Sequence, residues 1–178
     1  LMTGMHTGHA LVRGNKEVQP EGQSPLADSA VTIPEVLGKA GYVSGMFGKW
    51  GLGAPASEGD PMNQGFDRFY GLNCQRQSHN FYPTHVWSDR NKVQLDRKHY
   101  SHTLIADECL KFIRANKDKP FFLYYGLQQP HVPRTPHPRF VGATGMGPRG
   151  DVIAEADWCV GELIKTLKKE GVLENTLI

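Results

Sequence analysis

Residues 42–53, Tyr-Val-Ser-Gly-Met-Phe-Gly-Lys-Trp-Gly-Leu-Gly, decide the fold that the sequence predicts. Their first half, 42–47, is typical of a short buried strand, and their second half is a glycine-rich turn. Lys49 stands where the strand gives way to the loop. Because open α/β sheets bind ligands at the carboxyl ends of their strands, we expect Lys49 to lie near a binding site. Glycines in this turn let the backbone approach a ligand closely.

Length and composition indicate one ordinary globular domain. The chain has 178 residues, of which 39% are hydrophobic and 21% charged, and that size supports a real core. A formal net charge of +2 gives no argument for a nucleic-acid partner. The longest apolar run, 121–125, is too short to cross a bilayer. Cys74, Cys109 and Cys159 lie far apart in the sequence and form no zinc-binding spacing, and we expect buried thiols at the last two.

The elements around residues 42–53 alternate between helix and strand. A capping box, Thr32 to Glu35, opens a short helix that ends at Gly41. Ser101 is expected to cap a helix over 101–116, and Asp151 to cap the last one. An apolar run, 121–125, is typical of a strand buried on both faces. The helix positions that we expect to face the core are Val36, Leu37, Ala40, Ile105, Cys109, Phe112, Ile113, Ile153, Ala156, Val160, Leu163, Ile164 and Leu167.

This order predicts an α/β fold with a mostly parallel sheet between helices. Residues 86–95 are expected to form a small hairpin, and 175–178 read as the first residues of a further strand. Residues 66–83 combine aromatic and polar side chains and are expected to form a long loop of the kind that builds binding sites. That loop includes Ser78 and His79.

Lys49 and His131 both follow predicted strands. Parallel strands would bring the two side chains to one edge of the sheet, where an ammonium group and an imidazole together suit an oxyanion. The alternative is structural: Lys49 as a solvated loop residue and His131 as part of a rigid Pro-His-Val-Pro turn. Ser78 and His79 offer a hydroxyl and a second imidazole, but no acid partner for a nucleophilic triad is visible. No carboxylate cluster predicts a metal site within the chain.

Several motifs, taken in order, resemble the type I sulfatase family of the alkaline phosphatase superfamily, in its arylsulfatase-like branch. They cover nearly the whole chain: Leu-Met-Thr-Gly at 1–4, Thr-Ile-Pro-Glu-Val-Leu at 32–37, Gly-Lys-Trp-Gly-Leu-Gly at 48–53, Gly-Phe-Asp at 65–67, Phe-Tyr-Gly at 69–71, Pro-Phe-Phe-Leu-Tyr-Tyr at 120–125, Pro-His-Val-Pro at 130–133 and Gly-Val-Leu-Glu-Asn-Thr-Leu-Ile at 171–178.

The resemblance implies roles for four residues. Lys49 would hold the sulfate oxygens and the nucleophile, and His131 would contact the sulfate group and assist the leaving oxygen. Ser78 and His79 would bind substrate, as the Ser-His of the family's following loop does. Many members carry a histidine two residues after the lysine, where this chain has Gly51; His79 is the candidate to supply the missing contact.

The resemblance also implies that residues 1–178 are part of the N-terminal catalytic domain of a longer sulfatase. The formylglycine nucleophile and an aspartate pair for calcium are expected upstream, and an Asp-Asn pair downstream. The intact enzyme would cleave a sulfate monoester of a small molecule or carbohydrate, while this chain alone would be inactive. Export to the periplasm or secretion is common for the family. The alternatives are a phosphonate or phosphodiester hydrolase of the same superfamily, and a non-catalytic binding or structural domain.

Overall fold

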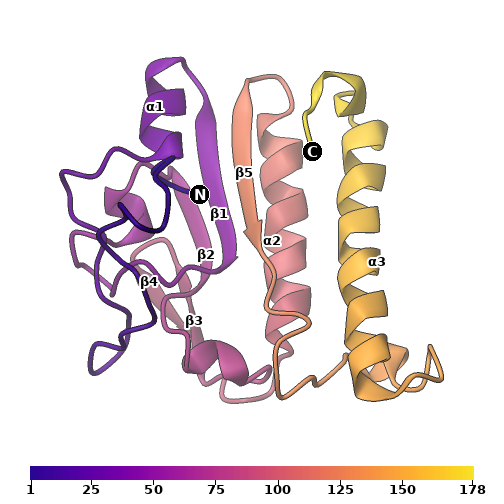
Figure 1. Cartoon of the computed structure of the whole chain (residues 1–178). Helices are drawn as coiled ribbons and strands as arrows, with labels where there is room; N and C mark the ends of the chain where they lie inside the picture. Colours follow the sequence, from indigo (N-terminus) through magenta and orange to yellow (C-terminus); the bar gives the residue numbers. More distant parts are fainter.

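The computed structural model describes all of residues 1–178 and contains one sheet with helices around it (Figure 1). In chain order the elements are α1 (Ile33–Lys39), β1 (Val43–Lys49), β2 (Arg68–Leu72), β3 (His85–Ser88), β4 (Asn91–Gln94), α2 (Ser101–Asn116), β5 (Phe121–Gly126) and α3 (Gly147–Lys169), with 3-10 turns at Pro61–Asn63, Gln77–His79, Pro138–Phe140 and Leu173–Asn175. The strands lie in the order β4-β3-β2-β1-β5. None of the helices combines the length and apolar character needed to span a membrane.

β1 is the central strand of the parallel part of the sheet. It pairs in parallel with β2 on one side and with β5 on the other, which confirms the predicted α/β architecture. The β2–β3 and β3–β4 pairs are antiparallel, so the predicted hairpin near 86–95 extends the sheet and makes it mixed. β1 runs two residues beyond the predicted strand, and Lys49 is its last residue.

The prediction that 66–83 is all loop is wrong at its beginning, where β2 forms. Phe69 and Leu72 are fully buried in this strand, and its backbone pairs with β1 from Gly45↔Arg68 to Lys49↔Leu72. Pairing across the sheet, which local sequence does not report, makes this aromatic segment a strand. The loop proper begins at residue 73.

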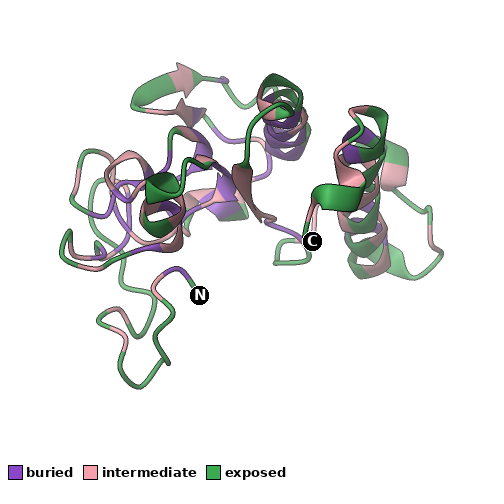
Figure 2. Ribbon diagram, turned by 90° about the horizontal axis from the view of Figure 1, so that it is seen from above, coloured by how far each residue is buried: buried purple, intermediate pink, exposed green.

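The sheet buries side chains on both faces because neighbouring residues of a strand point to opposite sides. Phe47 faces one cluster, which also contains Tyr70, Leu72, Val86, Leu95, Ile105, Cys109 and Phe112. Met46 faces the other, with Met2, Trp50, Phe66 and Phe69. Figure 2 shows buried residues in the central strands, on the inner side of the helix next to β5 and in parts of the loops, whereas the outer faces of the helices are exposed.

α2 has the predicted bounds and the predicted buried face of Ile105, Cys109, Phe112 and Ile113. Its N-cap, however, is Tyr100 rather than Ser101. Ser101 is the first helical residue, and its hydroxyl donates to the carbonyl oxygen of Phe81 (3.1 Å). The serine therefore ties the helix to the long loop instead of capping it.

In α1 the predicted capping box is confirmed, but the predicted buried face is not. The Glu35 carboxylate accepts hydrogen bonds from the Thr32 backbone and hydroxyl (2.7 and 2.9 Å). Val36 and Ala40 are exposed, and Pro34 is the buried residue of this helix. The Thr32 hydroxyl also lies 2.9 Å from the Gln64 carbonyl oxygen, so its single proton is shared between this oxygen and Glu35, and the start of the helix is held against the loop that contains Gln64.

α3 begins at Gly147, so the predicted cap at Asp151 is wrong. The Asp151 carboxylate instead accepts hydrogen bonds from Gly142 N, Thr144 N and the Thr144 hydroxyl (2.8, 3.1 and 2.8 Å), and so fixes the preceding loop. Ile153 and Ile164, predicted to face inward, are exposed. The buried residues of α3 are Asp151, Val152, Glu155, Cys159, Thr166 and Leu167, because the helix packs on α2 with this partly polar face.

At the end of the chain two predictions are wrong. β5 lies at the edge of the sheet, so all six of its residues are only half-buried rather than buried on both faces. No strand forms at 175–178. A 3-10 turn ends at Asn175, the Thr176 hydroxyl donates to the Val172 carbonyl (2.7 Å), and Leu177 and Ile178 are exposed.

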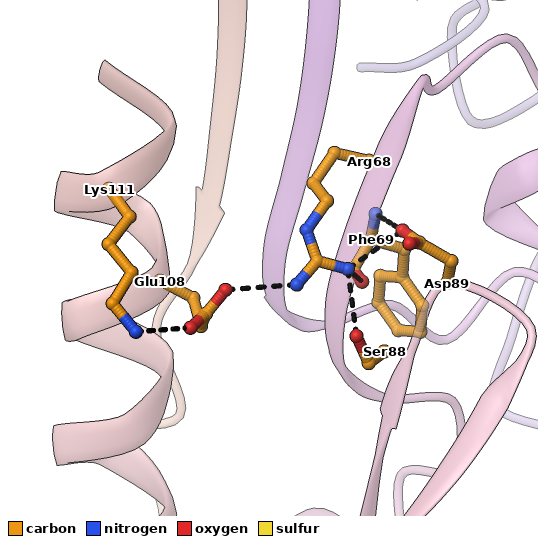
Figure 3. Close-up of polar contacts among 6 residues, drawn as sticks. All are labelled: Arg68, Phe69, Ser88, Asp89, Glu108 and Lys111. Atoms are coloured by element: carbon orange, nitrogen blue, oxygen red, sulfur yellow. Dashed lines mark hydrogen bonds and ion pairs between the residues drawn. The ribbon is translucent and has the colours of Figure 1, made fainter. Parts of the chain in front are cut away.

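A network around Arg68 joins the amino end of β2 to the hairpin and to α2 (Figure 3). Its guanidinium bonds the carboxylates of Asp89 and Glu108 (2.8 and 2.9 Å) and the hydroxyl of Ser88 (2.9 Å). Lys111 pairs with the second oxygen of Glu108 (2.7 Å). Since Leu72 is at the other end of β2, this network stabilises the sheet away from the edge that carries Lys49.

Three glycines lie side by side across the parallel strands, at or one residue before their carboxyl ends. Gly48 pairs with Gly71 on one side and with Gly126 on the other. A Cβ at Gly48 would collide with the Gly126 carbonyl, and a Cβ at Gly71 with the Gly48 carbonyl. Gly48 also has a φ of 107°, a conformation that side chains disfavour. We call this set the glycine row.

Candidate functional site

Three loops leave the carboxyl ends of the parallel strands β1, β2 and β5 and meet at one edge of the sheet. They are residues 50–67, 73–84 and 127–146. Because the strands are parallel neighbours, Lys49 at the end of β1 and His131 beyond β5 belong to the same edge, as predicted. This edge is the candidate active site.

His79 and His131 stack on one another. Their ring centroids are 4.7 Å apart and their planes differ by 11°. Both residues are exposed. Partial burial lowers the pKa of His79, and the nearby charges of His131 and Lys49 lower this pKa further. The structure therefore gathers Lys49, His79 and His131 into one group of cationic and titratable side chains.

Lys49 is half-buried, and burial lowers the pKa of its ammonium group. His131 Nδ1 bonds the Val132 carbonyl (2.8 Å), and a carbonyl oxygen only accepts. The proton of a neutral ring therefore sits on Nδ1, which leaves Nε2 as the nitrogen that can exchange a proton with a ligand. The site thus offers one fixed positive charge and a histidine with a defined tautomer.

Ser78 lies beneath this group and is buried. Its hydroxyl donates to the Cys74 carbonyl (3.0 Å), and its own carbonyl accepts from Gln128 Nε2 (2.6 Å). These bonds join the loop after β2 to the loop after β5 and place His79 over His131. A direct contact between Ser78 and substrate stays a prediction.

Three buried polar side chains near the site were not predicted as site residues, although two of them, Gln128 and Gln129, lie just beyond the end of β5. Both glutamines and His102 are almost fully buried. The amide atoms of Gln129 and Nε2 of His102 have no hydrogen-bond partner. The His102 ring lies 5.1 Å from that of Phe81, and burial lowers the pKa of His102 from 6.5 to about 3. The neutral imidazole is thus the native form.

Position 51 has its own local geometry. Gly51 has a φ of 87°, and a Cβ there would overlap Nε2 of Gln75. The histidine that the resemblance expects at this position therefore does not fit unless Gln75 moves. The Gln75 amide fills that space instead.

The chain contains no group of three His, Cys, Asp or Glu side chains able to hold a metal ion. All three cysteines are free and buried, as expected for Cys109 and Cys159. A cavity of about 770 Å³ is lined by Tyr42, Pro120 and Val172 among others. It lies at the amino ends of β1 and β5, opposite the candidate site.

The family profile described as Sulfatase matches residues 1–178. The chain is 29% identical to an N-acetylgalactosamine-6-O-sulfatase of Bacteroides thetaiotaomicron, over 100% of this chain and 47% of that protein. It is 31% identical to human arylsulfatase A, over 89% of this chain and 36% of that protein.

A solved structure from work on glycosaminoglycan metabolism by Bacteroides thetaiotaomicron superposes with a TM-score of 0.82. Its sequence identity is 24%, and the match covers 98% of this chain and 49% of that one, so the likeness shows the fold. The chain spans about half the length of this structure and of the Bacteroides relative.

Proposed function

The chain belongs to the sulfatase family, and on that premise we propose that the full-length protein hydrolyses sulfate esters at the edge where Lys49, His79 and His131 meet. One observation carries the proposal: a half-buried lysine shares the carboxyl edge of a parallel sheet with two stacked imidazoles. Such a group suits a tetrahedral anion, because charge and hydrogen-bond donors converge there.

Each residue has a distinct part in this proposal. The Lys49 ammonium binds sulfate oxygens, and its partial burial strengthens the attraction relative to water. His131, whose Nε2 is free, donates a proton to the leaving oxygen once it is protonated. His79 makes a second contact with the sulfate group and orients the His131 ring by stacking.

The proposal includes a formylglycine nucleophile and calcium, both expected outside residues 1–178. The side chains of this chain do not fit a calcium site, since no cluster of three suitable ligands occurs among them. This division is consistent with residues 1–178 being one part of the catalytic domain.

For the substrate we propose a sulfated carbohydrate. Support comes from the Bacteroides relative, named for a 6-O-sulfated N-acetylgalactosamine, and from the polar loop 73–84 beside the site, which offers hydrogen-bonding groups for hydroxyls. Export to the periplasm or secretion stays a prediction from the resemblance.

The test uses the full-length protein with 4-nitrophenyl sulfate and 6-O-sulfo-N-acetylgalactosamine. We expect hydrolysis of sulfate esters, and a loss of about 100-fold in kcat/KM for Lys49→Ala, because a group that stabilises developing negative charge is removed. Lys39→Ala is the matched control: Lys39 is exposed at the end of α1, near the amino end of β1, and its loss should leave kcat/KM unchanged.

Two outcomes would overturn the proposal. Faster turnover of a phosphonate monoester or phosphodiester than of any sulfate ester would assign the protein to the neighbouring class of hydrolases. Absence of hydrolysis with all of these esters would instead support a non-catalytic binding role.

A further inference from the structure

Gln75 places an amide group in the candidate site that no motif of the sequence points to. It is the third residue after β2, while Gly51 is the second residue after the neighbouring strand β1. The two loops are joined at their start by a hydrogen bond from Trp50 N to the Leu72 carbonyl (3.0 Å). Gln75 and Gly51 therefore leave adjacent strands together, at the edge where Lys49 lies.

The Gln75 side chain lies directly over Gly51. A Cβ at Gly51 would overlap Gln75 Nε2, with the amide carbon next in distance at 3.3 Å. The positive φ of Gly51 and its lack of a side chain both permit this approach. Trp50, between Lys49 and Gly51, is buried in the core, and the Gln75 amide occupies the space next to Gly51.

The two residues that follow Gln75 have partners within the protein. Arg76 pairs with Glu17 (2.6 Å), and Gln77 Nε2 donates to the His85 carbonyl (3.1 Å). The Gln75 amide has no such partner and is only half-buried, so it is free to bind a ligand. An amide placed this way offers two N–H donors and carries no charge.

We propose that the Gln75 side-chain amide is a further sulfate-binding group, which donates a hydrogen bond to an oxygen of the anion held by Lys49. This inference rests on the proposed function and adds a neutral donor to the site. Because an amide does not titrate, its contribution to binding is independent of pH. The amide therefore holds the anion without transferring a proton.

The inference is tested by titrating inorganic sulfate into the full-length protein and measuring heat of binding. Gln75→Met keeps the length of the side chain and removes the donors, so we expect sulfate to bind about tenfold more weakly. Gln75→Glu places a negative charge beside the anion and should weaken binding further than Gln75→Met. Gln94→Met is the control, since Gln94 is exposed on β4 at the far edge of the sheet.

A structural role for Gln75 predicts a different pattern. Gln75→Met and Gln75→Glu would then bind sulfate as wild type does, while their melting temperatures fall; this result would overturn the inference. Parallel hydrolysis assays separate it from the proposed function, because a protein that binds sulfate through Gln75 without hydrolysing esters upholds this inference and contradicts the other.

A second pair of variants keeps the inference testable if Gln75→Met unfolds. Gly51→Asn supplies an amide from the opposite loop, and asparagine tolerates positive φ better than other side chains. In the wild-type background it collides with Gln75 and weakens sulfate binding. The double variant Gly51→Asn with Gln75→Ala should bind sulfate more tightly than Gln75→Ala alone. Equally weak sulfate binding by the double and the single variant would contradict the inference.

Discussion

Acid is expected to destabilise the protein through His102, which lies beneath the candidate site. This histidine is 3% exposed, and its pKa falls from 6.5 in a solvated chain to about 3 in the fold because burial disfavours the imidazolium. A depressed histidine pKa means that the unfolded chain binds the proton first. The stability from the neutral ring is therefore complete above pH 6.5 and is lost as the pH falls from 6.5 towards 3.

The magnitude follows from proton linkage between the two pKa values of His102. Between pH 7.5 and pH 5 the unfolded state gains about 2 kcal/mol relative to the folded state. This is a large fraction of the 5–15 kcal/mol that stabilises a typical domain. His102 contacts Phe81, whose loop carries Ser78 and His79, so the site should loosen as well.

The assay is urea unfolding of the full-length protein, followed by tryptophan fluorescence at several pH values from 7.5 to 5. His102→Phe keeps an aromatic ring against Phe81 and removes the titration, so its free energy of unfolding should fall by about 2 kcal/mol less than that of wild type over this range. His99→Phe, at an exposed histidine three residues earlier, should follow wild type. Equal losses for wild type and His102→Phe would refute the reasoning.

Three further substitutions test the packing, each by urea unfolding. Gly48→Ala should cost about 3 kcal/mol or more, because a Cβ meets the Gly126 carbonyl at a positive φ; unchanged stability would contradict the close approach. Phe112→Ala should cost about 3–5 kcal/mol by removing a buried ring 5.4 Å from that of Phe47, whereas exposed Val36→Ala should cost little. Arg68→Met leaves Asp89 and Glu108 without a partner but partly solvated, so we expect about 1–2 kcal/mol, and less at high salt.

The sequence predicted those parts of the fold that depend on local signals. The capping box at Thr32 and the apolar face of α2 both act within a few residues, and each was found where expected. The alternating order of helices and strands predicted parallel neighbouring strands, and therefore predicted that Lys49 and His131 lie at one edge of the sheet. Prediction failed where distant pairing decides the outcome: β2 is a strand because it pairs with β1, and β5 is half-exposed because it has one neighbour in this sheet.

In the site, Lys49 and His131 were predicted because each lies at, or a few residues beyond, the carboxyl end of a predicted strand. How these residues lie relative to the other side chains of the site was not predictable. Loops 73–84 and 127–146 take their shape from buried polar contacts, such as the one between Ser78 and Gln128. Asp151 is another residue whose role could not be predicted from local sequence. Its spacing suits a helix cap, yet its carboxylate binds backbone groups of the loop that precedes α3. No spacing rule reports how closely the Gln75 amide approaches Gly51.

The glycine row has a consequence for how this enzyme class can diversify. In the glycine row, backbone without side chains lies at the edge of the sheet that carries the site. Substitution of Gly71, Gly48 or Gly126 should therefore deform the sheet rather than alter a contact with substrate. In a library of variants selected for new ester specificity, substitutions at these three positions should therefore yield few folded proteins. Variants with new specificity should instead carry substitutions in the loops, where Gln75 and its neighbours can change while the glycine row is kept.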